Sequence, residues 1–145
     1  MLIPKRGDMY VADLGEGIGS EQANERPVVI IQNNKGNHYA DTTIIVPITS
    51  QMKAQLPNHV IIHYGILTKY QGCVLTEQIR TISVLRLKGI VSILDPRASS
   101  RIKTAYREEA LSSLPEKNMT ENITELKRFW RKIRESYGKM SIGKK

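Results

Sequence analysis

The 145-residue chain has few of the residues that build disulfides or metal sites, with one cysteine and three histidines. The single cysteine, Cys73, excludes an internal disulfide and is typical of a reducing compartment, and this set of residues completes no zinc pattern. No apolar run approaches the roughly 20 residues of a membrane span, and the N-terminus lacks the apolar core of a signal peptide. We therefore expect a cytoplasmic protein with no membrane segment, no metal and no other cofactor.

The common phosphate-binding loops are also missing. The glycine-rich segment 15–19 lacks the lysine and the Ser/Thr of a P-loop, and its glycines do not have the dinucleotide-binding spacing. We interpret it as a flexible hinge that leads into a polar loop.

Positive charge is abundant and concentrated near the C-terminus. The net charge is +8. Residues 1–94 hold nine basic and seven acidic residues, whereas 124–145 hold eight basic and two acidic ones. This distribution is compatible with a polyanionic partner, although it says nothing about fold.

Short apolar and β-branched segments bounded by turn residues predict a mainly β fold. The expected strands are residues 8–14, 28–32, 42–48, 59–63, 73–79, 81–85 and 87–94, with a turn at 33–37. Pro47 predicts an edge or a bulge in the third strand. Strands without helices between them favour a small, strongly curved antiparallel sheet or barrel.

Two helices are expected after the strands. Asp95 and Pro96 form a good helix start, and the first helix should reach about Leu114. A second helix, 118–137, has apolar residues spaced 4-3-4-3-4 and a basic opposite side. We therefore divide the chain into 1–114, the sheet with its closing helix, and 115–145, a basic amphipathic extension.

Arg26 and Thr49 are the residues best placed for chemistry on a phosphate. If the strands at 28–32 and 42–48 pair antiparallel, Arg26 and Thr49 fall near the same end of the sheet. A guanidinium offers forked donors to a phosphate, and a threonine hydroxyl adds another. Such a site could stabilise a pentacovalent phosphate without a metal, and RNA supplies its own 2′-hydroxyl nucleophile.

More ordinary interpretations stand beside this one. Arg26 could simply pair with Glu21 or Glu25. His59 and His63 lie four residues apart on a strand, about 13 Å between Cα atoms, which is too far for one shared site. His38 falls in a turn and should be exposed, and we interpret Cys73 as a small core residue.

Several motifs together resemble the MazF/PemK (Kid) family of toxin–antitoxin ribonucleases. In chain order they are Arg6-Gly-Asp-Met-Tyr-Val-Ala-Asp-Leu14, Gly19-Ser-Glu-Gln22, Arg26-Pro-Val-Val-Ile-Ile-Gln-Asn33, Ile48-Thr-Ser50, Leu56-Pro-Asn-His-Val60 and Glu77-Gln-Ile-Arg-Thr-Ile82. The resemblance covers roughly residues 4–95. It implies an SH3-like small barrel of the CcdB/PemK type and a homodimer. It also implies metal-independent cleavage of single-stranded RNA to 2′,3′-cyclic phosphate and 5′-hydroxyl ends, and a MazE-like antitoxin partner.

Position by position, the resemblance makes Arg26 and Thr49 the catalytic residues. It places Ser20, Glu21 and Gln22 on a mobile loop over the site. It aligns further residues with the RNA groove: Asn33, Gln51, Lys53, Leu56, Glu77 and Gln78. Their Asn, Gln and Glu side chains suit the edges of unpaired bases.

Two other functions remain open at this stage. One is a non-catalytic SH3-like module that binds nucleic acid, and the other is a toxin of the same fold directed at DNA gyrase, as the CcdB proteins are. The tail leaves alternatives as well. Its helix could pack on its own barrel or dimer mate, or it could bind RNA, the ribosome or the antitoxin.

Overall fold

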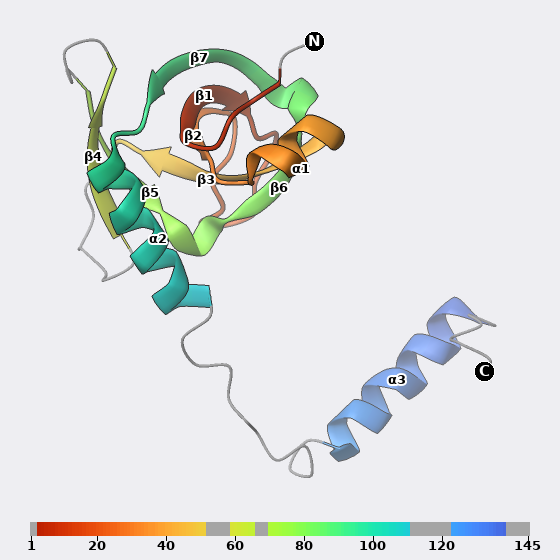
Figure 1. Cartoon of the computed structure of the whole chain (residues 1–145). Helices are drawn as coiled ribbons and strands as arrows, with labels where there is room; N and C mark the ends of the chain where they lie inside the picture. The colour runs from red at the N-terminus through yellow and green to blue at the C-terminus, as the bar shows by residue number, and fades with distance from the viewer. Residues whose placement is uncertain (1–2, 52–58, 66–69, 111–122, 139–145) are drawn as a thin grey trace. The chain divides into compact units, whose positions relative to one another are not determined.

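The computed structural model describes residues 3–51, 59–65, 70–110 and 123–138 (Figure 1). Its strands are β1 (Asp8–Asp13), β2 (Glu25–Ile30), β3 (Thr42–Thr49), β4 (His59–Tyr64), β5 (Tyr70–Leu75), β6 (Arg80–Ser83) and β7 (Leu87–Ile93). All pair antiparallel, in the order β4-β5-β3-β2-β1-β7, with β6 added to β3. The sheet curls round on itself in Figure 1, which confirms the predicted curved antiparallel sheet.

The described helices are α1 (Asn34–Tyr39), α2 (Pro96–Ala110) and α3 (Ile123–Tyr137), with 3-10 turns η2 (Thr76–Gln78) and η3 (Val84–Arg86). Residues 1–113 and 114–145 form two compact units, and α3 belongs to the second. Among the described residues, no helix is long and apolar enough to cross a membrane.

Where β2 and β3 pair, both faces of the sheet are buried, which explains why these two strands contain short apolar runs. Val28 and Ile30 point into a cluster with residues of β1 and β3, whereas Val29 points into a second cluster. That second cluster also contains Ala98 and Ile102 of α2. Because successive side chains of a strand point to opposite faces, β2 contributes to both clusters and fixes α2 against the sheet.

Helix α2 begins as predicted. The Asp95 side chain accepts a hydrogen bond from Ala98 N at 2.7 Å, and Asp95 O accepts one from Ser99 N at 3.0 Å. Asp95 therefore caps the helix, with Pro96 at its first position.

The second strand starts three residues earlier than predicted. Arg26 and Pro27 lie inside β2, opposite Ala12 and Val11 of β1. Proline favours an extended conformation for the residue before it. The strand therefore includes Arg26 and Pro27 and does not begin after Pro27.

Pro47 does not mark an edge, because β3 is an interior strand. The part of β3 that pairs with β6 ends at Ile45, and the part that pairs with β5 starts at Ile48. Pro47 lies between these two parts. A residue without an N–H is tolerated where one neighbouring strand ends and the next has not begun.

Three other predicted elements need correction. The turn at 33–37 is the short helix α1, capped by Asn33, whose side chain accepts from Gly36 N at 2.8 Å. The strand at 73–79 stops at Leu75, where η2 begins, and the strand at 81–85 stops at Ser83, before η3. The predicted start of the last helix, residues 118–122, lies outside the described residues.

Candidate functional site

Arg26 is held at the start of β2 by the end of the loop that precedes the strand. Its side chain is partly exposed, and its Nε donates a hydrogen bond to Ala23 O at 3.0 Å. This bond fixes the base of the guanidinium and leaves the two Nη groups for other partners.

The two acids nearest in sequence do not pair with Arg26. Glu25 lies 3.3 Å from Lys88 Nζ, and the Glu21 carboxylate accepts a hydrogen bond from Ile18 N at 2.8 Å. No carboxylate of the described residues forms an ion pair with Arg26. The ordinary interpretation, in which Arg26 pairs with Glu21 or Glu25, is therefore wrong.

Thr49 ends β3 beside the start of β2. The β2–β3 pairing ends with Val28 opposite Pro47, and Arg26 and Thr49 each lie two residues beyond that pair, at the same end of the two strands. The predicted antiparallel pairing is thus confirmed. Thr49 is buried, and its hydroxyl oxygen accepts a hydrogen bond from Gln51 N at 3.2 Å.

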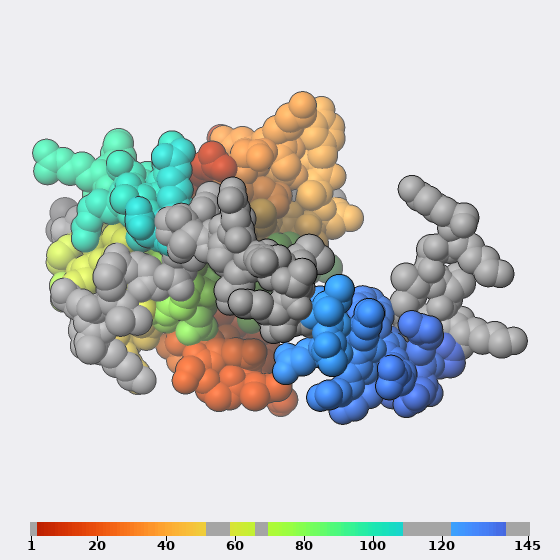
Figure 2. Space-filling model, turned by 90° about the horizontal axis from the view of Figure 1, so that it is seen from below, coloured from red at the N-terminus to blue at the C-terminus, as the bar shows by residue number. Residues whose placement is uncertain are grey.

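The loop between β1 and β2 is closed at its base. Leu14 N donates to Asn24 O at 2.9 Å, and Asn24 N donates to Gly15 O at 2.7 Å. Gly15, Gly19 and Asn24 all have left-handed backbone angles, and a Cβ at Gly17 would lie 2.9 Å from Glu21 O. The glycines that we interpreted as a hinge therefore give this loop its tight folds. On the face shown in Figure 2, the orange-red loop lies at the surface of the first unit.

The loop and η2 form the two walls of a groove of about 600 Å³. Five of the predicted RNA-binding residues line it together: Ser20, Glu21, Gln22, Glu77 and Gln78. The Gln78 carboxamide joins the walls, because its Oε1 accepts from Gln22 N at 2.7 Å and its Nε2 donates to Ser20 O at 3.0 Å.

The groove also brings in residues that the sequence did not identify as site residues. Glu16 and Arg80 line it, and His59 Nε2 lies 3.0 Å from Glu77 Oε1. Arg80 and His59 both lie inside the motifs that carry the family resemblance, and that position was the only indication in the sequence that they could belong to the site. The His59–Glu77 contact joins β4 to η2, and its two partners are distant in sequence, so spacing alone could not reveal it.

Cys73 lies directly across from Thr49 in the β3–β5 pairing. It is buried, as predicted for a core residue. Burial, with a smaller contribution from the charge of Glu77, raises the pKa of its thiol above the ordinary value of 9.0. At neutral pH the thiol is therefore protonated and a poor nucleophile.

Some predicted groove residues are not brought to this groove. Asn33 lies beyond the other end of β2 from Arg26, where it caps α1. Gln51 is exposed just after Thr49, and its side chain does not line the groove. Lys53 and Leu56 lie outside the described residues.

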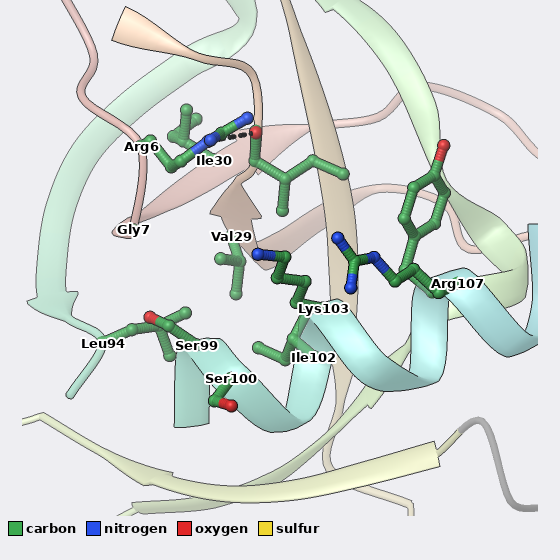
Figure 3. A pocket seen from close by; sticks show the side chains of 12 residues that line it. Arg6, Gly7, Val29, Ile30, Leu94, Ser99, Ser100, Ile102, Lys103 and Arg107 are labelled. Atoms are coloured by element: carbon green, nitrogen blue, oxygen red, sulfur yellow. Dashed lines mark hydrogen bonds between the residues drawn. The ribbon is translucent and has the colours of Figure 1, made fainter. Parts of the chain in front are cut away.

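A second cavity, of about 660 Å³, lies between α2 and the far end of β2 (Figure 3). Its floor is apolar, and Arg6, Lys103 and Arg107 line its side. Arg6 is fixed there by a hydrogen bond from Nε to Ile31 O at 2.8 Å. This cavity lies at the opposite end of β2 from Arg26 and is separate from the groove.

In the part of the chain that the structure describes, no three His, Cys, Asp or Glu side chains gather in a way that could hold a metal ion. The donors that line the groove include the Arg80 guanidinium, the Ser20 hydroxyl and the side-chain amides of Gln22 and Gln78. These groups bind phosphate and base edges directly.

Residues 5–109 match the sequence model of a family described as PemK-like, MazF-like toxin of type II toxin-antitoxin system. The chain belongs to this family. Endoribonuclease EndoA of Bacillus subtilis is 44% identical to this MazF-like chain over 110 residues, which cover 73% of the chain and 93% of EndoA. Endoribonuclease MazF of Staphylococcus saprophyticus is 42% identical over 106 residues, covering 70% of the chain and 86% of that protein.

Solved structures confirm the MazF-like fold. MazF (Form-I) from Deinococcus radiodurans superposes with a TM-score of 0.65 at 17% identity, covering 74% of this chain and 96% of that one. An endoribonuclease in complex with its cognate antitoxin, from Mycobacterial species, gives a TM-score of 0.63 at 24% identity and covers 77% and 99%. Helix α3 begins after the last residue of the family match.

Proposed function

We propose that this MazF-like chain is the toxin of a toxin–antitoxin system and a sequence-specific endoribonuclease. It cleaves single-stranded RNA, mRNA in particular, and so inhibits translation and growth. The observation that carries this proposal is the antiparallel β2–β3 pairing, which supports an Arg26–Thr49 site at one end of the two strands. The loop that precedes Arg26 lines a groove with amides and carboxylates, which supports RNA binding there. The names of EndoA and MazF as endoribonucleases support the same activity.

The chemistry is an internal transfer on the RNA backbone. The 2′-hydroxyl oxygen attacks the adjacent phosphorus and releases its proton to solvent water, the bond to the 5′-oxygen breaks, and that oxygen takes a proton from solvent water. The products are a 2′,3′-cyclic phosphate and a 5′-hydroxyl. Arg26 stabilises the extra negative charge of the phosphorane through its free Nη donors, and Thr49 donates to a phosphate oxygen. The role that we assign to Arg26 is this stabilisation of charge.

The groove beside Arg26 holds the unpaired bases. Glu21, Gln22 and Glu77 offer carboxylate and amide groups that can bind the edges of bases in single-stranded RNA. We keep Ser20, Gln51, Asn33, Lys53 and Leu56 as further RNA contacts of the full assembly.

Cleavage of a diverse pool of single-stranded RNA in excess EDTA tests the activity. We expect cuts at a short recurring sequence, with cyclic-phosphate and 5′-hydroxyl ends identified by mass spectrometry. No cleavage across the pool would contradict the proposal. RNA binding without cleavage would favour the binding module, and inhibition of DNA gyrase would favour the gyrase-directed toxin.

A homodimer and a cognate MazE-like antitoxin are the proposed partners. Strand β7 ends the sheet and exposes Ile90, Val91 and Ile93, an apolar edge that a second copy can cover. We expect a mass of twice 16.4 kDa by light scattering. Ile90→Glu should yield monomer, whereas Lys88→Gln on the same strand should not. A wild-type monomer at all concentrations would contradict the dimer.

A further inference from the structure

We propose that Gln78 is a positioning residue that latches the β1–β2 loop to η2, and that it controls the placement of the loop over the site. This inference rests on the proposed ribonuclease function. It differs from the role that the family resemblance implies for Gln78, which is contact with RNA.

The latch is made by both ends of one carboxamide. Gln78 Oε1 accepts from Gln22 N at 2.7 Å, and Gln78 Nε2 donates to Ser20 O at 3.0 Å. The two bonds hold the backbone on both sides of Glu21. A carboxamide supplies both the acceptor and the donor that this arrangement needs. The two bonds fix the orientation of the amide while the loop is closed, and they use one of its two N–H donors.

The η2 side of the latch is anchored in the first unit. Thr76 is buried, Glu77 contacts His59 of β4, and Ile79 packs against the cluster that includes α2. The loop side has much less support. Residues 16–21 are all exposed. The loop is also closed at its base, by the bonds between Leu14, Gly15 and Asn24 and by the bond from Arg26 Nε to Ala23 O. Gln78 is therefore a second attachment point for the loop.

The loop that Gln78 holds is hydrogen-bonded to Arg26, the candidate catalytic arginine. Gln22 is held by Gln78, and the next residue, Ala23, accepts the hydrogen bond from Arg26 Nε. Displacement of Gln22 would move the Ala23 carbonyl and with it the guanidinium. The latch thus joins η2 to Arg26 through two hydrogen bonds and the two adjacent residues Gln22 and Ala23.

The closed loop also has an unfavourable feature. In this arrangement Gln22 Oε1 is buried and has no hydrogen-bond partner among the described residues. A buried acceptor without a partner disfavours the closed loop. The balance between this acceptor and the two latch bonds sets how often the loop opens to admit RNA.

Hydrogen exchange at the Gln22 amide tests the latch directly in the full-length, RNA-free protein. Gln78→Met removes both bonds while keeping the length of the side chain, and we expect the Gln22 amide to exchange about tenfold faster. Gln78→Glu retains an acceptor and should keep most of the protection. Gln71→Met, an exposed glutamine on β5, is the matched control and should change nothing. Unchanged Gln22 exchange in Gln78→Met would overturn the latch.

Cleavage kinetics separate positioning from base contact. A latch predicts that Gln78→Met lowers kcat/KM by a similar factor for the preferred RNA and for RNAs with one altered base. A change in the preferred sequence would instead show that Gln78 contacts a base, and it would contradict the proposal. Because the exchange measurement uses no RNA, failure of the latch is distinguishable from failure of the ribonuclease function.

Discussion

At the residue scale, Arg26 forms no ion pair with Glu21 or Glu25 because the side chains of these two acids point elsewhere. Glu25 precedes Arg26 on a strand, so its side chain emerges on the opposite face, where it meets Lys88. Glu21 folds back to its own loop at Ile18 N. Proximity in sequence suggested a salt bridge, whereas strand geometry separates the charges. The identity of the candidate residues could be predicted from sequence, but their partners could not.

The contribution of the Thr49 hydroxyl to cleavage can be tested with a substitution that keeps the volume of the side chain nearly unchanged. We expect Thr49→Val to lower kcat by about tenfold or more, because a donor to the phosphate is lost. Thr49→Ser keeps the hydroxyl and should retain most of the activity. Equal rates for Thr49→Val and wild type, with matched thermal unfolding, would remove Thr49 from the mechanism.

The raised pKa of Cys73 predicts slow alkylation in the native protein. We expect iodoacetamide to label Cys73 slowly at neutral pH and quickly after unfolding, since the thiolate is the reactive form. The folded state holds this proton more tightly than the unfolded chain. The thiol therefore contributes stability below its unfolded pKa, and that contribution is lost as pH rises through the folded pKa. Fast labelling of the folded protein would contradict this account.

At the scale of elements, long regular segments were predictable and single turns were not. The β-branched runs of β2 and β3 and the Asp95–Pro96 start of α2 carry strong local signals. The turns α1 and η2 do not, because one turn has no periodicity and depends on distant contacts. For α1 these include the bond from Thr43 Oγ1 to Asn37 Oδ1. Residues 76–78, which we predicted as the end of a strand, form η2 instead, and this turn places Gln78 against the loop.

Gly72 on β5 is expected to tolerate no side chain. A Cβ there would lie 2.4 Å from Ile48 Cγ2, next to Thr49 in β3. We expect Gly72→Ala to lower the free energy of unfolding by about 1–3 kcal/mol through overpacking. Gly89 on β7 has nothing within 4 Å of its would-be Cβ, so Gly89→Ala is the control and should have little effect. Equal denaturant midpoints for the two variants would contradict the packing described here.

At the scale of the whole molecule, charge is distributed unequally between the groove and the tail. The groove is lined by Glu16, Glu21 and Glu77 against one cation, Arg80. Helix α3, beyond the family match, carries five basic and two acidic residues. A polyanionic substrate is poorly attracted to such a groove alone, so we expect the tail to contribute long-range attraction.

Salt dependence of RNA affinity tests this contribution. Three cations flank the exposed Trp130 on α3, and we expect their joint replacement by glutamine in the full chain to reduce the slope of log Kd against log salt by about 2. These residues are Lys127, Arg131 and Arg134. Replacing Arg128 and Lys132 is the control and should have a smaller effect. An unchanged slope in the triple variant would show that the tail charges are merely solvated.

The most direct test of the central claim is the cleavage rate of Arg26→Ala on the RNA that wild type cuts fastest. We predict a loss of at least about 100-fold in kcat, because the phosphorane loses its main charge stabilisation. Thermal unfolding and dimer mass should remain those of wild type, since Arg26 forms no ion pair with the described residues. A well-folded Arg26→Ala protein that cleaves RNA at the wild-type rate would contradict the account.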